Sequence, residues 1–346
     1  MAKIRVLVVD DSALMRGLLK QLISGDEDFE VVATAQDPYD AWKKVKEYSP
    51  DVMTLDVEMP RMDGLSFLER LMHLHPMPVL MVSSLTEEGC ATTLRALELG
   101  AIDFVSKPKV DIRTQMFERS EEFLQKLMAV SRARVIRSRQ RSAANPVERK
   151  APRAMLKTTL KVVAIGASTG GTEALREVLM QLPPDSPPVA IVQHMPPGFT
   201  KSFAARLDSL CAVRVKEAVD GDRLMAGHVL IAPGDFHMAL TRSGATYGVR
   251  VYAGERVNRH CPSVDILFES FATHAGGNAV GVILTGMGND GARGLLKMHQ
   301  NSAFTIAQDE DSSVVYGMPK EAVQLGAVNR VLSLGRVAQG ILDACV

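Results

Sequence analysis

Short, nearly continuous apolar runs alternate with helix-like segments along the first third of the chain. In the helix-like segments, apolar residues recur every three or four positions, which is the spacing of one face of an α-helix. Strands that are apolar along their whole length are typical of a parallel sheet covered on both faces. The pattern therefore predicts a small doubly wound α/β domain with five parallel strands. The predicted strands are 4–9, 30–35, 52–56, 79–83 and 101–106.

The same alternation returns in the second half of the chain. The strongest buried strands are expected at 162–166, 189–194 and 279–284, each followed by a helical segment. Between the last two, residues 213–252 are polar and rich in turn residues, with short alternating runs that indicate hairpins. We therefore predict a second, larger doubly wound α/β domain with a mostly parallel sheet and a hairpin.

A basic segment separates the two patterns. Residues 131–161 hold ten lysines and arginines and a single acidic residue, Glu148. Such a composition is typical of a solvated linker. A nucleic-acid tether is the alternative, but the segment has no interleaved aromatic residues to stack on bases. The predicted organisation is a first domain at 1–125, a basic linker at 126–157 and a second domain at 158–346.

Composition argues against several classes of function. The chain has 346 residues, of which 40 are basic and 40 acidic, so a net charge of zero argues against general attraction to nucleic acid or membranes. No apolar run approaches the roughly 18 residues of a membrane span, so membrane insertion is not expected. The four cysteines include no C-x-x-C pair, which argues against a zinc site or a disulfide framework. We predict a cytoplasmic protein with reduced thiols.

Acidic residues follow the ends of two strands of the first domain. Asp10 and Asp11 follow the first strand, and Asp56 ends the third. Because the carboxyl ends of parallel strands lie together, these carboxylates should share one site, where all-oxygen ligands suit Mg²⁺. Ser83 at the end of the fourth strand could supply a hydroxyl, and Lys107 after the fifth could neutralise a phosphoryl group. The plainer alternative, aspartates that only cap helices, does not explain the whole set.

Four short motifs surround these residues: VVDDS at 8–12, LDVEMPRMDG at 55–64, MVSS at 81–84 and VSKP at 105–108. Together they resemble the response-regulator receiver domain, which has a flavodoxin-like fold. The resemblance covers about the first third of the chain and implies that Asp56 accepts phosphate from a sensor histidine kinase. It also implies that Mg²⁺ is held by Asp11, Asp56 and the backbone carbonyl of Glu58, with Asp10 assisting through water.

A serine stands between a strand and a helix at the start of the second domain. Residues 166–170 read GASTG, the pattern of a nucleophile elbow, in which glycines permit a sharp turn and the helix N-terminus offers N–H groups to an oxyanion. His194 ends the next strong strand and Asp290 lies in the loop after a later one. Ser168, His194 and Asp290 therefore form a candidate catalytic triad. A rival nucleophile is Cys261, which follows a histidine, although sequence neighbours rarely point at each other.

Six motifs of the second domain are GASTGG at 166–171, QHM at 193–195, CPSVD at 261–265, LTGMGND at 284–290, QD at 308–309 and YGMP at 316–319. Together they resemble the chemotaxis protein-glutamate methylesterases, the CheB family. With the receiver in front, the resemblance spans nearly the whole chain except the linker. It implies that Ser168, His194 and Asp290 are the triad and that the N–H of Met287 serves the oxyanion hole. The N–H of Thr169 is our own candidate for a second donor, because it follows the nucleophile.

The resemblance implies a phosphorylation-activated serine hydrolase of chemotactic adaptation. It would demethylate glutamate methyl esters on methyl-accepting chemoreceptors, releasing methanol, and deamidate glutamines on the same proteins. No cofactor is expected at the esterase site. Two alternatives come from other classes: a receiver-controlled module that only binds an anion at the Ser168 turn, and a transcriptional regulator, which only the basic linker favours.

Overall fold

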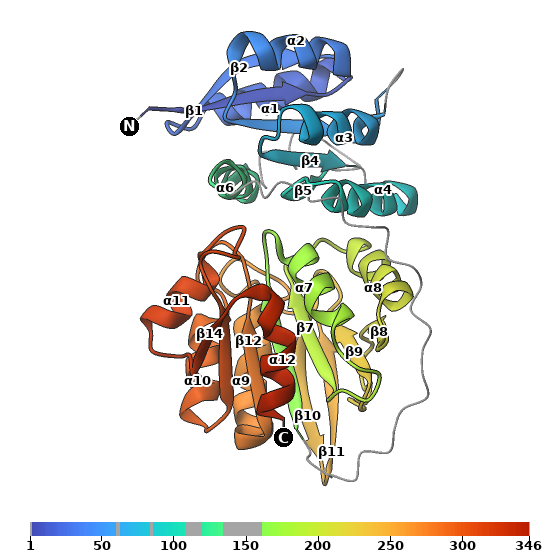
Figure 1. The fold of residues 1–346 in the computed structure, drawn as a ribbon, viewed down its shortest axis with the longest axis vertical. Coiled ribbons are helices and arrows are strands. Elements are labelled where there is room, and N and C mark those ends of the chain that lie inside the picture. Colours follow the sequence, from blue (N-terminus) through green and yellow to red (C-terminus); the bar gives the residue numbers. More distant parts are fainter. Residues whose placement is uncertain (1, 60–62, 84–85, 108–119, 134–160, 346) are drawn as a thin grey trace. The chain divides into compact units, whose positions relative to one another are not determined.

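The computed structural model describes residues 2–59, 63–83, 86–107, 120–133 and 161–345. The chain forms two compact units, residues 1–141 and 142–346, and each is built on a parallel sheet (Figure 1). None of the described helices is long and apolar enough to cross a membrane.

The first unit contains five parallel strands in the order β2-β1-β3-β4-β5. Every residue of β3 and β4 is buried although successive side chains point to opposite faces, so both faces of the sheet are covered. The predicted five-stranded doubly wound fold is confirmed. The strands are β1 (Ile4–Val9), β2 (Phe29–Ala35), β3 (Val52–Asp56), β4 (Val79–Ser83) and β5 (Asp103–Ser106). The helices are α1 (Ala13–Ser24), α2 (Pro38–Tyr48), α3 (Gly64–Leu74), α4 (Glu87–Glu98) and α6 (Ser120–Ser131).

Helix caps in this unit come from residues other than the three predicted site aspartates. The Ser12 hydroxyl accepts from the N–H of Met15 and begins α1. Asp10 lies outside that cap, and its Oδ1 accepts from the N–H of Ser12 (2.9 Å). The capping alternative therefore does not account for Asp10, Asp11 and Asp56.

Helix α6 extends the first unit beyond the predicted boundary at residue 125. It runs to Ser131 and contacts β4 and β5, and its buried residues include Leu127 and Val130. Because these apolar side chains are covered by the sheet, residues 126–131 belong to a packed helix rather than to a solvated linker. The predicted boundary is too early for this reason. Residues 134–157 of the predicted linker lie outside the described residues.

The second unit contains seven parallel strands in the order β14-β13-β12-β6-β7-β9-β8. Strands β10 and β11 form a separate antiparallel hairpin (Figure 1). The strands are β6 (Val162–Ala167), β7 (Val189–Gln193), β8 (Arg214–Glu217), β9 (His228–Ile231), β10 (His237–Ser243), β11 (Thr246–Tyr252), β12 (Ala279–Ile283), β13 (Phe304–Gln308) and β14 (Arg330–Leu332). The helices are α7 (Gly171–Met180), α8 (Phe199–Leu210), α9 (Val264–His274), α10 (Ala292–Gln300), α11 (Met318–Gln324), α12 (Leu334–Ala344) and the short 3₁₀ helix η1 (Gly276–Asn278).

The segment 213–252 differs from the prediction in its first half. Strands β10 and β11 form the expected hairpin, whereas β8 and β9 pair in parallel and extend the main sheet. Turn residues and alternation identify short strands, but they do not tell which strand each will join. The prediction of hairpins is therefore wrong for residues 213–231.

The strand order of the second unit reverses at β6. From β6 the chain first adds β7 on one side and much later β12 on the other. In open α/β sheets, ligands bind outside the carboxyl ends of the strands at such a reversal. The loops after β6, β7 and β12 therefore lie where a functional site is expected, and they carry the three residues of the predicted triad.

Helix α9 fixes the surroundings of that position. Its fully buried side chains include Leu267, Phe268 and Phe271, and the helix contacts α10, β10 and the sheet strands β6, β7 and β12. A Cβ on Gly166 in β6 would lie 2.2 Å from Val264, the first residue of α9. The glycine therefore lets the N-terminus of α9 approach the sheet next to the loop after β6.

Candidate active site and phosphorylation site

Ser168 occupies the sharp turn between β6 and α7. Gly170 in this turn has a left-handed φ of +76°, and a Cβ there would lie 2.6 Å from Val314. Position 170 therefore requires glycine for two reasons: its left-handed backbone conformation and the close approach of the Val314 side chain. Ser168 itself is 9% exposed, so the turn brings it to the edge of the buried core rather than into open solvent.

Hydrogen bonds hold the backbone of Ser168 from two sides. Its N–H donates to the carbonyl of Thr285 (3.0 Å), and its carbonyl accepts from the N–H of Gly171 (2.7 Å). The same carbonyl accepts from Nε2 of Gln193 (2.9 Å), which also lies 3.3 Å from the carbonyl of His194. One buried amide therefore links the ends of β6 and β7, and the position of Ser168 is set by hydrogen bonds to its main-chain atoms.

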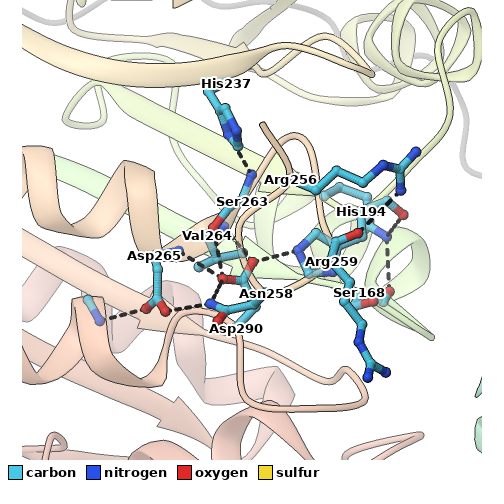
Figure 2. Close-up of polar contacts among 12 residues, drawn as sticks. Ser168, His194, His237, Arg256, Asn258, Arg259, Ser263, Val264, Asp265 and Asp290 are labelled. Carbon is cyan, nitrogen blue, oxygen red and sulfur yellow. Dashed lines mark hydrogen bonds and ion pairs between the residues drawn. The ribbon is translucent and has the colours of Figure 1, made fainter. Parts of the chain in front are cut away.

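His194 directly follows β7. This strand pairs with β6, which Ser168 directly follows. The residues before them, Gln193 and Ala167, are paired in the sheet, and the N–H of His194 donates to the carbonyl of Ala167 (3.2 Å). Nε2 of the imidazole lies 2.8 Å from Oδ2 of Asp290 (Figure 2). Nδ1 is buried and has no hydrogen-bond partner among the described residues. The structure thus brings the histidine and the aspartate of the predicted triad into direct contact.

Asp290 lies in the loop between β12 and α10, and its carboxylate contacts the N-terminus of α9 (Figure 2). It accepts from the N–H of Val264 (2.7 Å), the hydroxyl of Ser263 (2.8 Å) and Nδ2 of Asn258 (2.8 Å). Burial alone would raise the pKa of this carboxyl, but hydrogen bonds from His194, Asn258 and Val264 hold the pKa well below its usual range. Because a carboxylate can only accept, Nε2 of His194 must carry the proton. In the neutral imidazole, a proton on Nε2 leaves on Nδ1 the lone pair that a general base needs.

The two predicted oxyanion donors lie in segments next to Ser168. Thr169 follows it in the turn, and Met287 follows Gly286, where a Cβ would lie 2.8 Å from Cβ of Ser168. The Gly286 carbonyl is fixed in turn by the N–H of Met318 (2.8 Å). Both segments are therefore anchored close to the serine, while the donor roles of Thr169 and Met287 stay predictions.

Several polar partners at this site were not found from the sequence. Asn258 stands in a polar loop and carries no pattern signal, and Ser263 has no signal beyond its place in the CPSVD motif. Gln193 offered a usable signal, because a polar side chain at the end of an apolar, buried strand is costly unless it is hydrogen-bonded. A strand-end glutamine beside a candidate catalytic histidine could therefore have been predicted to anchor the site.

Cys261, the rival nucleophile, has an unfavourable environment. Burial and the negative charge of Asp235 raise the pKa of its thiol, which lowers the fraction of reactive thiolate. The preceding residue, His260, lies face to face with His194. The histidine that precedes Cys261 thus stacks on His194, and Ser168 stays the predicted nucleophile.

In the first unit, the structure brings Asp10, Asp11 and Asp56 together at the strand ends. One oxygen from each carboxylate lies within 4.8 Å of the other two. Nζ of Lys107 lies 2.9 Å from Oδ2 of Asp10 and 2.7 Å from Oδ2 of Asp56. The N–H of Glu58 donates to Oδ1 of Asp56 (3.2 Å), so residue 58 borders the cluster. An all-oxygen set of this kind suits a hard divalent cation, and the lysine suits a phosphoryl group.

Ser83 is fully buried at the end of β4. Its hydroxyl lies 2.6 Å from that of Thr93 in α4 and 3.4 Å from the carbonyl of Gly89. Its own carbonyl accepts from the N–H of Lys107 (2.7 Å). Ser83 therefore connects the lysine of the acidic cluster to helix α4, and Thr93 is a partner that the sequence did not reveal.

Burial gives Asp56 an unusual titration. It raises the pKa of this carboxyl from 3.8 to about 6, against the opposing charge of Lys107 and with the charge of Asp10 adding to the rise. The folded protein therefore binds this proton more tightly than the unfolded chain does. Tighter binding of this proton adds to the free energy of unfolding. The contribution is complete below pH 3.8 and is lost as the pH rises through about 6.

We expect Asp56→Asn to stabilise the first unit by about 2 to 3 kcal/mol at neutral pH without divalent cations, because the buried charge is removed. Near pH 4 the difference should vanish, since the wild-type carboxyl is then largely protonated. Denaturant unfolding followed by the fluorescence of Trp42, the only tryptophan, reports on this unit because Trp42 lies in α2. Asp28→Asn, at an exposed position, is the control. A gain of equal size at both pH values would show that burial of the charge is not its cause.

The two units together define a class of protein: a receiver-type α/β unit joined to a hydrolase-type α/β unit with a serine, a histidine and an aspartate at its strand ends. Residues 6–116 match the response regulator receiver domain family. Residues 163–341 match the CheB methylesterase family. The chain belongs to the CheB methylesterase family.

Relatives of similar length share more than half of their residues with this chain. The protein-glutamate methylesterase/protein-glutamine glutaminase of Salmonella typhimurium is 58% identical over 342 residues, covering 99% of this chain and 97% of that protein. The protein of the same name from Bordetella parapertussis is 59% identical over 343 residues, with the same coverage. Among solved structures, the CheB methylesterase catalytic domain of Thermotoga maritima is 40% identical with a TM-score of 0.52, covering 53% of this chain and 97% of that one. These similarities confirm the predicted family and fold and do not favour a transcriptional regulator or a binding module.

Proposed function

We propose that this protein hydrolyses glutamate methyl esters on chemoreceptors, releasing methanol, and deamidates glutamines on the same receptors during chemotactic adaptation in the cytoplasm. Membership of the CheB methylesterase family and the receiver domain in front support this assignment. The observation that carries the chemistry is the contact between His194 and Asp290. With Nε2 directed at Asp290, Nδ1 of the neutral imidazole carries the lone pair, and His194 follows the strand adjacent to the one that Ser168 follows.

In the first half of the proposed reaction, Nδ1 of His194 takes the hydroxyl proton of Ser168 while Oγ attacks the ester carbonyl. The resulting imidazolium is stabilised by Asp290, which keeps its charge and takes no proton. Negative charge on the former carbonyl oxygen would be met by the N–H groups of Met287 and Thr169. His194 then protonates the departing methoxide, which leaves as methanol, and the glutamyl group stays on Oγ as an ester.

In the second half, His194 removes a proton from water, and the water oxygen attacks the acyl-enzyme carbonyl. When the bond to Oγ breaks, His194 returns the proton to Ser168, and the receptor glutamate leaves as a free carboxylic acid. A glutamine substrate follows the same path with ammonia as the leaving group. The side chains of the chain itself supply every proton transfer in this scheme.

For the first unit, we propose that Asp56 accepts a phosphoryl group from a histidine kinase. Asp11, Asp56 and the carbonyl of Glu58 would hold Mg²⁺, with Asp10 acting through water, and the ion would neutralise charge during phosphoryl transfer. Lys107 already contacts Asp56, so its ammonium group is positioned to pair with a phosphoryl oxygen. The oxygen donor set of the cluster supports this proposal.

The substrate assignment is tested with membranes that carry chemoreceptors bearing isotopically labelled methyl esters. We expect the protein to release labelled methanol from them, and ammonia from receptors with glutamine at the same positions. Membranes whose receptors carry neither group are the control. Turnover of small soluble esters with no release from methylated receptors would keep the hydrolase chemistry and contradict the receptor assignment.

A further inference from the structure

A tight turn at residues 257–260 lies against the proposed triad. Val257 and His260 exchange two backbone hydrogen bonds (3.0 and 2.9 Å), which closes a two-residue turn. Both central residues are left-handed, with φ of +49° at Asn258 and +71° at Arg259. Such turns normally use glycine, because other residues are strained in this region. Backbone strain of this kind persists only where contacts with the surrounding structure hold the conformation. The contacts of this turn should therefore explain why it is retained.

The tip of the turn is tied to the carboxylate of the triad. Nδ2 of Asn258 donates to Oδ1 of Asp290 (2.8 Å) and to Oδ2 of Asp265 (2.7 Å), as Figure 2 shows. Oδ1 of Asp265 accepts in turn from the N–H of Gly294 at the start of α10 (2.6 Å). One amide thus joins the turn to two carboxylates on different elements, which fixes the position of the turn relative to Asp290.

The last residue of the turn covers the imidazole of the triad. The ring of His260 lies parallel to that of His194, with the ring centroids 3.6 Å apart and an angle of 10° between the planes. This separation is direct van der Waals contact over the whole ring face. The turn therefore contacts the triad twice, at the carboxylate through Asn258 and at the imidazole through His260.

The stacked ring supplies a restraint that the hydrogen bonds do not. Among the described residues, the side chain of His194 makes one hydrogen bond, from Nε2 to Asp290, and its Nδ1 has no partner. A ring held by one such bond can still tilt about the bond, which would move Nδ1 relative to Ser168. A parallel ring in contact blocks that tilt on one side.

We propose that His260 is a positioning residue that keeps the imidazole of His194 in the plane needed for proton transfer from Ser168. This inference rests on the proposed triad and extends it. Misplacement of a reacting group by about 1 Å can cost about a hundredfold in rate. Loss of the stacked ring should therefore lower kcat and leave KM nearly unchanged, because the restraint acts on the base and not on the substrate.

The test compares His260→Ala, His260→Phe and His260→Gln in the full-length protein, with His274→Ala as the control at an exposed histidine of α9. Methanol release from methylated receptors gives kcat and KM. We expect His260→Ala and His260→Gln to lower kcat about tenfold to a hundredfold with KM within about twofold of wild type. Phenylalanine retains a flat ring, so His260→Phe should recover most of kcat.

Three results would overturn the proposal: an unchanged kcat in His260→Ala, a change confined to KM, or equal losses in His260→Phe and His260→Gln. Thermal unfolding of each variant identifies any that fail to fold, and the comparison of phenylalanine with glutamine then decides between stacking and polar contact. If wild type releases no methanol, the proposed function fails. If His194→Ala is inactive while His260→Ala matches wild type, only the present inference fails.

Discussion

Replacing Ser168 by alanine should lower methanol release by about four to six orders of magnitude. The substitution removes the oxygen that forms the acyl-enzyme bond, while the turn should persist because its hydrogen bonds use main-chain atoms of residue 168. His194→Ala should cost a comparable factor, since Nδ1 is the proposed acceptor of the serine proton. Single-turnover release of labelled methanol measures both losses. Ser209→Ala, at an exposed serine of α8, should match wild type.

The losses of rate in Ser168→Ala and His194→Ala should not multiply when the two substitutions are combined. Because the serine and the histidine act in the same step, the double variant Ser168→Ala/His194→Ala should be barely slower than either single variant. A fluorophosphonate, which reacts with activated serines, should label wild type at Ser168 and fail to label His194→Ala. Losses that multiply, or labelling that survives without the histidine, would mean that the two residues do not form a catalytic unit.

Asp290→Asn should also be severe, at about four orders of magnitude in kcat. The amide oxygen, at the position of Oδ1, can still accept from the hydroxyl of Ser263 and from Nδ2 of Asn258, so the loop should keep its position. Its NH₂ group would then face Nε2 of His194 and require a lone pair there, which moves the imidazole proton to Nδ1. A histidine with its proton on Nδ1 cannot accept the serine proton. An active Asp290→Asn variant with an unchanged melting temperature would rule out this role.

Asp56→Asn should reduce phosphate uptake from acetyl phosphate to background. An amide has no nucleophilic carboxylate oxygen, and the neighbouring Asp10 is engaged with Ser12 and Lys107. Uptake by wild type should also disappear when Mg²⁺ is removed with a chelator, because the three carboxylates need a cation to approach a phosphoryl group. Radiolabel retained after acid precipitation measures the effect, and the exposed Asp28→Asn is the control.

Asp56→Asn also distinguishes activation by phosphorylation from the basal esterase activity. Acetyl phosphate should raise methanol release by wild type and by Asp28→Asn, and it should leave Asp56→Asn at its basal rate. The basal rate of Asp56→Asn should match that of unphosphorylated wild type, because Ser168, His194 and Asp290 all belong to the second unit. Radiolabel that persists on Asp56→Asn would place the phosphorylated residue elsewhere.

Elements with a strong local period were predictable from the sequence. Buried strands such as 79–83 and 162–167 are apolar along nearly their whole length, and this signal does not depend on distant residues. Residues at the ends of these strands were predictable for the same reason, since the carboxyl ends of parallel strands meet at one edge of a sheet. Asp10, Asp56, Ser168 and the other strand-end residues are examples of this rule.

The pairing of strands and the ends of helices depended on the tertiary structure. Strands β8 and β9 have turn-rich surroundings like those of a hairpin, yet they join the main sheet because β9 packs beside β7. Helix α6 continues to Ser131 because a sheet surface covers its apolar side chains. Local sequence contains the tendency to form an element, but the partner surface that decides its neighbours and its length lies far away along the chain.

By itself, the sequence determined two α/β units, the acidic cluster at the strand ends of the first, and a serine, a histidine and an aspartate at the strand ends of the second. Only the tertiary structure decided the charge, the tautomer and the hydrogen-bond partners of those residues. Asn258 and His260 come from a turn with no periodic signal, and they reach Asp290 and His194 through space. The proton position on His194 follows from an ionised Asp290, whose charge depends on donors collected from separate loops. Charge and tautomer are set by the surroundings of a group, and folding creates those surroundings.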